Sequence, residues 1–195
     1  NKEVLGGLLY DYTYKTLADL AASNLLPEIV QVGNETNRMI LQKEGEDAGM
    51  DWDRNAFLIN KGIKAVRDIA KAENKEIGLM LHIAQPENGL WWFKQATENG
   101  ITDFDWIGLS YYPLWSEYKL DNVGAAFKEL ITTYKKRLMV VETAYPFTME
   151  NKDEGIALDL KFSDAWQHLT CDTRYHVFKV MVDMLQAAQI ADDLA

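Results

Sequence analysis

The chain has 195 residues, of which 48% are hydrophobic and six are tryptophan, as expected for one globular domain with a sizeable core. Its net charge of −10 and pI near 4.8 argue against nucleic acid and anionic membranes as partners, because both need clustered Lys and Arg. The single cysteine, Cys171, excludes an internal disulfide and a CxxC metal site.

The first predicted elements are a helix and a strand. Apolar residues at helical spacing predict an amphipathic helix over residues 8–22. The stretch "EIVQVG" then predicts a strand over residues 29–33 that is buried on both faces. Asn34 and Glu35 follow directly, so an ionisable carboxylate comes straight after a buried strand.

The rest of the chain alternates predicted helices and strands. Strands are expected over 76–84, 105–113 and 137–145, and helices over about 52–72 (capped by Asp51 or Asp53), 90–100, 123–134 and 177–188. Continuous apolar strands about 30 residues apart are typical of parallel βαβ units. No linker divides the chain, so residues 1–195 form one predicted domain, either an open doubly wound sheet or part of a (β/α)8 barrel.

Each predicted strand delivers polar or aromatic side chains at its carboxyl end. These side chains are Asn34, Glu35, His82, Tyr111, Tyr112 and Glu142. Carboxyl ends of parallel strands share one face where ligands bind, so Glu35 and Glu142 should meet in one crevice. Two carboxylates in a cleft suggest glycoside hydrolysis, in which one is a proton donor and the other attacks or activates water. The alternative is a structural role, with both carboxylates ion-paired to arginines on neighbouring strands.

Several motifs carry a resemblance to a known family. "VQVGNETN", "DWIGLSYYPLW" and "VVETAYPFT" look like the strand-four, strand-six and strand-seven motifs of family 53 glycoside hydrolases, and "YDYTYKTL" and "LMLHIA" match as well. These are the endo-β-1,4-galactanases (arabinogalactan endo-1,4-β-galactosidases) of the larger retaining (β/α)8 clan. The resemblance runs over residues 10–147. It implies an α/β fold, a TIM barrel, of which this chain holds about four central strand–helix units as a partial catalytic domain.

The resemblance also implies roles for individual residues. Glu35 would be the acid/base, and Asn34 would hold the 2-hydroxyl of the sugar. Glu142 would be the nucleophile that forms a galactosyl–enzyme intermediate, in a double displacement that uses the two glutamates.

The aromatic residues and the histidine near the strand ends would complete the substrate site. Tyr111 or Tyr112 would orient Glu142 through a phenolic hydrogen bond, and the sequence leaves open which one. His82 would line the substrate groove. Trp115 is a candidate stacking platform for galactose, the alternative being a loop tryptophan packed on the barrel rim. Core or helix–strand packing is expected of Trp91, Trp92 and Trp106.

The implied partner is a galactan or arabinogalactan polysaccharide, with no required cofactor and an extracellular or cell-envelope location. The acidic stretch 149–159 has oxygen ligands that a structural Ca²⁺ could use, and some bacterial family members bind calcium in this region. Its spacing is not that of an EF-hand, so we expect a solvated loop. His168 and His176 lack a metal-ligand pattern. Neither a signal peptide nor an apolar run long enough to span a membrane is visible.

A closed barrel is not expected from these residues alone. A complete barrel needs roughly 200 residues at least and about 250 typically, and the family's first three strands and its last strand have no match here. The strands near 29 and 138 should therefore have unpaired edges. The chain is then a fragment, the ordered part of a longer protein, or half of a pair that associates through these edges. We expect poor activity from the isolated chain.

The leading functional hypothesis is a retaining endo-β-1,4-galactanase. The first alternative is another endo-glycanase of the clan, such as a β-glucanase or a mannanase. The second is a truncated, non-catalytic carbohydrate-binding barrel.

Overall fold

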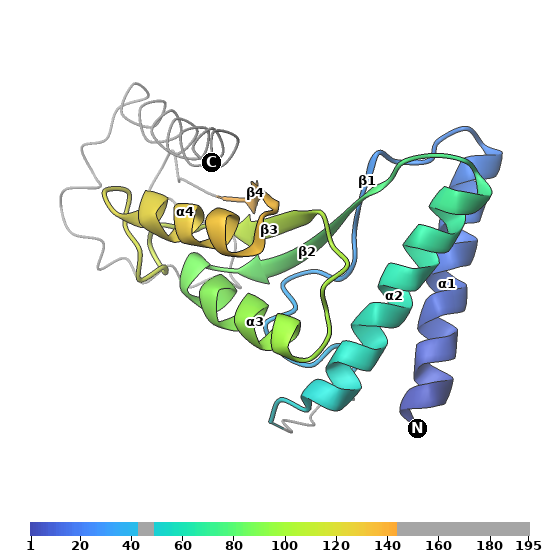
Figure 1. Cartoon of the computed structure of the whole chain (residues 1–195), viewed down its shortest axis with the longest axis horizontal. Helices are drawn as coiled ribbons and strands as arrows, with labels where there is room; N and C mark the ends of the chain where they lie inside the picture. The colour runs from blue at the N-terminus through green and yellow to red at the C-terminus, as the bar shows by residue number, and fades with distance from the viewer. Residues whose placement is uncertain (43–48, 144–195) are drawn as a thin grey trace, which may run out of the picture.

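The structure, a computed structural model, describes residues 1–42 and 49–143. In these residues helices and strands alternate along the chain (Figure 1). The elements are α1 (Lys2–Ala22), β1 (Ile29–Gln31), α2 (Trp52–Ala72), β2 (Gly78–Ala84), α3 (Pro86–Glu98), β3 (Trp106–Ser110), α4 (Val123–Tyr134) and β4 (Arg137–Glu142). The predictions for the helix at 177–188, Cys171, His168, His176 and the acidic stretch 149–159 fall outside the described residues.

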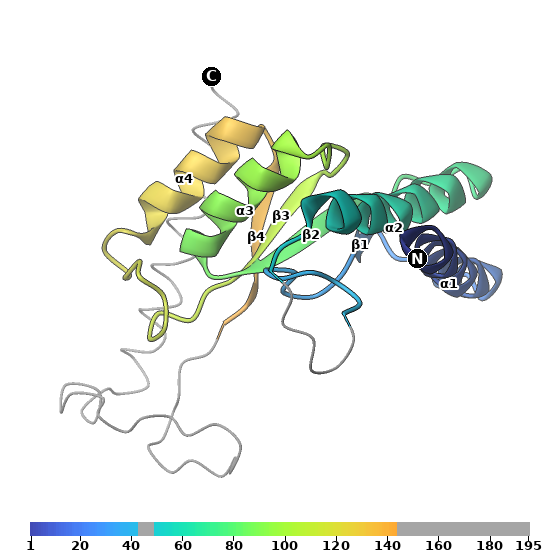
Figure 2. The same ribbon diagram turned by 90° about the horizontal axis from the view of Figure 1, so that it is seen from below.

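The strands form one parallel sheet in the order β1-β2-β3-β4. Right-handed crossovers between strands that follow one another in sequence place every crossover helix on the same face of the sheet. In Figure 2, α2, α3 and α4 follow one another along the same side of the strands. A doubly wound sheet would reverse its strand order and carry helices on both faces. The arrangement is therefore that of a (β/α) barrel segment.

The apolar core lies between the sheet and the crossover helices. Alternate residues of a strand point to opposite faces, and Leu79, Leu81 and Ile83 of β2 all point to the helices and are fully buried. Trp92 of α3 is fully buried in the same core, as expected. The polar side chains at the strand ends lie on the opposite face of the sheet.

Trp91 and Trp106, for which core or helix–strand packing is expected, lie outside the core. Trp91 is 48% exposed and its ring contact is with a residue of α2, so the expectation of core or helix–strand packing is wrong for it. Successive helical residues are about 100° apart, so Trp91 turns away from the sheet when Trp92 faces it, and it packs against Trp52 with ring centroids 6.1 Å apart. Trp106 is half-buried on the sheet face opposite the helices, where its indole lies against Gly78.

The two outer strands are paired on one side only among the described residues, as expected. β1 is shorter than the predicted 29–33, and its residues are half-buried or exposed. The expectation of a strand buried on both faces is wrong because β1 is an edge strand of this sheet. β4 ends at Glu142 instead of residue 145.

The helix starts are fixed by local capping. Asp51, and not Asp53, is the N-cap of α2, where its side chain accepts a hydrogen bond from the N–H of Arg54 at 3.1 Å. Pro86 opens α3 before the predicted residue 90, because a proline at the first helical position sacrifices no intrahelical hydrogen bond. Along the described part of the chain, no helix combines the length and apolarity that crossing a bilayer requires.

Candidate active site

The loop after β1 holds Glu35 over the end of β2. The N–H of Thr36 donates to the carbonyl of His82 at 3.0 Å. The amide of Asn37 accepts from the N–H of Ala84 at 2.8 Å and donates to its carbonyl at 3.0 Å, as a strand neighbour would. Glu35 itself has a left-handed φ of 45°, which is costly for a residue other than glycine. The hydrogen bonds on either side of Glu35 hold it in that conformation.

Glu142 reaches the same place through an irregularity in β4. Leu109 pairs with Val140, but Ser110 pairs with Glu142, so Val141 is an extra residue in the ladder. Such a bulge re-aims the side chain that follows it. Here it turns Glu142 to the sheet face that carries Ser110.

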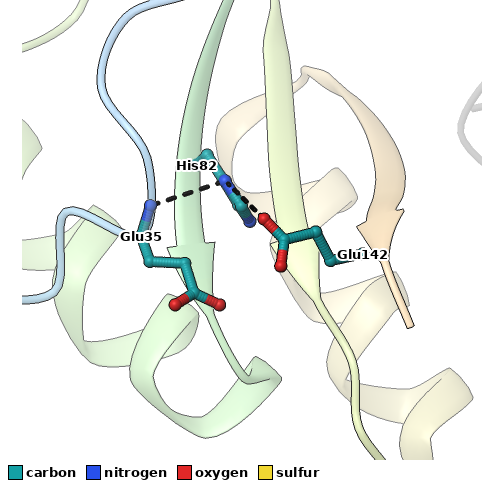
Figure 3. A group of neighbouring side chains, drawn as sticks. All are labelled: Glu35, His82 and Glu142. Atoms are coloured by element: carbon teal, nitrogen blue, oxygen red, sulfur yellow. Dashed lines mark hydrogen bonds and ion pairs between the residues drawn. The ribbon is translucent and has the colours of Figure 1, made fainter. Parts of the chain in front are cut away.

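Glu35 and Glu142 converge, as the sequence predicts. A carboxylate oxygen of each and a ring nitrogen of His82 all lie within 4.8 Å of one another (Figure 3). Glu35 is exposed and Glu142 is half-buried. Within residues 1–42 and 49–143 neither carboxylate has an ion pair with Lys or Arg, so the alternative of structural ion pairs finds no support there.

His82 lies beneath the two carboxylates, and this position corrects the expectation that it lines a groove. Its side chain is fully buried because it comes from the interior of β2, two residues before the strand ends. Nδ1 is 3.4 Å from the backbone nitrogen of Glu35 and 4.0 Å from Oε1 of Glu142 (Figure 3). Burial lowers the pKa of His82, against an opposing effect of Glu142 and Glu35, so the ring is neutral near pH 7.

Ser110 connects His82 to Glu35, and the sequence reasoning missed it. Its Oγ donates to Oε1 of Glu35 at 2.5 Å and lies 2.8 Å from Nε2 of His82. The available signal was strand periodicity, because Ser110 is two residues before Tyr112 and therefore lies on the same face.

The structure shows which of Tyr111 and Tyr112 contacts Glu142, a question that the sequence leaves open. The phenol of Tyr112 donates to Oε2 of Glu142 at 3.1 Å, and burial together with this bond raises the pKa of Tyr112. Tyr111 points to the helix face, where its hydroxyl donates to the carbonyl of Tyr118 at 3.3 Å and burial raises its pKa to about 12. Tyr112 is thus the tyrosine that contacts Glu142.

A second residue missed in the sequence supports Tyr112. Gln85 follows β2 with a left-handed φ of 67°, and its side-chain carbonyl accepts from the N–H of Tyr112 at 3.2 Å. Its own N–H donates to the carbonyl of Ser110 at 2.9 Å. Strained backbone of this kind is common at functional sites. No local sequence pattern marks the role of Gln85, since its two partners, Ser110 and Tyr112, lie at the end of β3 and just after it.

Trp115 lies on the loop between β3 and α4, next to Tyr112. Its indole is 53% exposed and meets the ring of Tyr112 edge-on, with centroids 5.4 Å apart. The Nζ of Lys119 ties the loop together by donating to the carbonyls of Pro113, Leu114 and Ser116. Trp115 is therefore an exposed aromatic face on an ordered loop next to Tyr112.

Asn34 is exposed beside Glu35, and its Oδ1 accepts from Nε2 of Gln31 at 3.3 Å. This contact orients the amide of Asn34 and leaves the residue exposed.

Glu35, His82 and Glu142 are also the group within the described residues whose ligand atoms are close enough to share a metal ion. Exposed acidic groups are commonly close together without an ion. Nδ1 of His82 already accepts the backbone N–H of Glu35 and Nε2 contacts Ser110, so coordination of an ion by His82 would replace one of these hydrogen bonds.

Comparison with known proteins agrees with this arrangement. The model of glycosyl hydrolase family 53 matches residues 2–191. The arabinogalactan endo-beta-1,4-galactanase of Cellvibrio japonicus is 57% identical over 153 residues, which are 77% of this chain and 41% of that protein. The endo-beta-1,4-galactanase of Bacillus subtilis is 36% identical over 148 residues, 74% of this chain and 32% of that protein.

Solved structures show the same likeness in three dimensions. The GH53 catalytic domain of Ignisphaera aggregans superimposes with a TM-score of 0.67 at 29% identity, over 79% of this chain and 41% of that one. The chain thus spans less than half the length of the relatives it matches. The sheet is part of a TIM barrel, and the chain belongs to glycosyl hydrolase family 53.

Proposed function

We propose that this chain provides the catalytic carboxylates of a retaining glycoside hydrolase that cleaves β-1,4-galactosidic bonds in galactan or arabinogalactan. The observation that carries the proposal is the approach of Glu35 and Glu142 to within 4.8 Å. Retaining glycosidases place their carboxyl groups about 5–5.5 Å apart, whereas inverting enzymes need about 6.5–9.5 Å to admit a water molecule. The close approach supports a double displacement.

In the first step Glu142 attacks the anomeric carbon. Its carboxylate oxygen forms a bond to that carbon as the bond to the leaving oxygen breaks, and Glu35 gives its proton to the leaving oxygen. The phenol of Tyr112 donates to Oε2 of Glu142 and so holds the carboxylate in position for the attack. In the second step Glu35 takes a proton from water, whose oxygen displaces Glu142 from the sugar.

The substrate class is supported by the relatives, two of which carry galactanase in their names. Trp115 offers an exposed indole on which the apolar face of a galactose unit can stack, and Asn34 offers an amide for the sugar 2-hydroxyl. The chemistry of two carboxylates requires no cofactor. A polysaccharide substrate fits an extracellular or cell-envelope location.

The test is reducing-sugar release from linear β-1,4-galactan by the protein in its longest available form. Glu142→Gln should lower the rate by roughly 10⁴-fold or more, because it removes the nucleophile and keeps the shape. Glu129→Gln, on the exposed side of α4, is the matched control and should retain full activity. No release from galactan by the folded protein would contradict the proposal and favour another glycan, such as a β-glucan or mannan, or a binding role.

A further inference from the structure

We propose that Ser110 and His82 act as a positioning pair that reserves Oε1 of Glu35 as a hydrogen-bond acceptor and so leaves Oε2 to carry the catalytic proton. The inference rests on the proposed function of Glu35 as acid/base. It assigns a reaction-related role to two buried residues on β2 and β3 that do not reach the substrate.

The donors and acceptors fix the direction of the hydrogen bonds. The Ser110 hydroxyl has one proton, and it points to Oε1 of Glu35 at 2.5 Å. At the 2.8 Å contact between Ser110 Oγ and His82 Nε2, the histidine must therefore be the donor. A neutral ring with a proton on Nε2 has none on Nδ1, and Nδ1 is the atom that faces the backbone N–H of Glu35 at 3.4 Å.

Burial protects this chain of hydrogen bonds from competition by water. Ser110 and His82 are both fully buried, so water does not compete for either bond. The lowered pKa of His82 agrees with the neutral ring that the geometry requires. The His82 ring accepts the backbone N–H of Glu35 directly and reaches the Glu35 carboxylate through the Ser110 hydroxyl. It therefore helps to fix both the main chain and the carboxylate of Glu35.

The chemical consequence concerns the two oxygens of Glu35. An acid/base must lose its proton towards the leaving oxygen and later take one from water, both times on the side of the sugar. With Oε1 held by Ser110, the proton enters and leaves at Oε2. The titratable groups that face Glu35 are His82 of β2, Tyr112 in the segment after β3, and Glu142 of β4.

The decisive experiment compares Ser110→Ala on substrates with poor and good leaving groups. Linear galactan needs a proton on its leaving oxygen, whereas a 2,4-dinitrophenyl β-galactoside does not, and kcat/KM reports the first step in both cases. We expect a loss of about tenfold or more on galactan and of less than about threefold on the activated substrate. Ser110→Thr, which retains the hydroxyl, should recover most of the galactan rate.

Thr97→Ala is the matched control, because it removes a hydroxyl that donates to the carbonyl of Phe93 in α3, away from the carboxylates. It should leave both rates unchanged. Equal losses on both substrates in Ser110→Ala would show a purely structural role and overturn the proposal, as would no loss on either.

A second measurement needs no activity. The ¹⁵N resonances of His82 in the unsubstituted protein should show a protonated Nε2 and an unprotonated Nδ1 near neutral pH. A proton on Nδ1 would reverse the hydrogen-bond chain and overturn the proposal, even if Ser110→Ala fails to fold. Failure of the unsubstituted protein to cleave galactan contradicts the proposed function instead, and the resonances still decide the direction of the hydrogen bonds between His82, Ser110 and Glu35.

Discussion

Within the described part of the chain, the carboxylates at the amino end of the sheet are paired with an arginine, whereas those at the carboxyl end are not. At the amino end, Arg67 of α2 binds Asp103 at 2.7 Å and Asp105 at 2.9 Å, and Asp105 also accepts from the N–H of Leu79. At the carboxyl end, Glu35 and Glu142 approach each other with a neutral histidine between them and no basic partner among the described residues. Neutralised charge contributes to stability, whereas charge left without a counter-ion remains available for chemistry.

The sharpest way to break this comparison is to neutralise one carboxylate at each end. Glu35→Gln should lower kcat on galactan by about 10²–10⁴-fold, because it removes the general acid/base, with little change in the free energy of unfolding. Asp103→Asn should lower the free energy of unfolding and leave kcat of the folded protein unchanged. Steady-state rates and urea titrations of both variants measure this, and a stability loss in Glu35→Gln larger than in Asp103→Asn would contradict the division.

The adjacent residues Tyr111 and Tyr112 test whether activity depends on the particular hydrogen bond to Glu142. Tyr112→Phe should reduce kcat about tenfold or more, because a hydrogen bond to a charged group is worth about 1.5–3 kcal/mol. Tyr111→Phe loses only a 3.3 Å contact to a carbonyl on the helix face and should keep its rate. Equal losses in kcat for the two variants would show that the phenol at Glu142 has no special role.

At the amino end, Arg67→Ala should lower the free energy of unfolding by about 1–2 kcal/mol, since it leaves the partly buried Asp105 without its ion pair and solvent screens part of the effect. Lys64→Ala removes an exposed pair with Asp68 on the same helix and should lower the free energy of unfolding far less. Urea unfolding compares the two variants. Similar losses would mean that Arg67 is an ordinary surface residue.

The smallest expected effect is a pH dependence of the unfolding free energy that differs between the two ends of the sheet. The folded-state pKa of His82 is lowered by burial, so the unfolded chain binds more protons and stability falls as pH drops below about 6.5. For Asp105, burial alone would raise the pKa, but hydrogen bonds from Arg67 and Leu79 lower it overall, so its contribution is lost only below about pH 3.9.

Urea titrations between pH 6.5 and 5 should therefore show a decline in the unfolding free energy that is reduced in His82→Gln and unchanged in Arg67→Ala. A decline of the same slope in His82→Gln would assign it to other groups.

The sequence predicts the parts of this arrangement that depend on local pattern. Apolar runs predict the strands, and parallel topology brings Glu35 and Glu142 together although 107 residues (142 − 35) separate them. Pairing across strands is not local, so the contacts of Ser110 and Gln85, and the burial of His82, were missed. Glu142 faces the site because of a bulge at Val141, and the regular alternation of side chains along a strand does not predict this bulge.

The same limit explains the errors about which residues are buried. The burial of β1 could not be judged from its apolar residues, because burial depends on which strands and helices cover it. Trp91 and Trp92 are identical in type and adjacent in sequence, and only the phase of α3 decides which of them enters the core.

The most direct test of the central claim is to trap the covalent intermediate. A 2,4-dinitrophenyl 2-deoxy-2-fluoro-β-galactoside carries a good leaving group, and its fluorine slows the second step, so a glycosylated enzyme should accumulate. The two-glutamate account predicts that peptide mass spectrometry finds the fluorinated sugar on Glu142, and that labelling is lost in Glu142→Gln. A label on another residue, or galactan cleavage with inversion of the anomeric centre and no label, would contradict it.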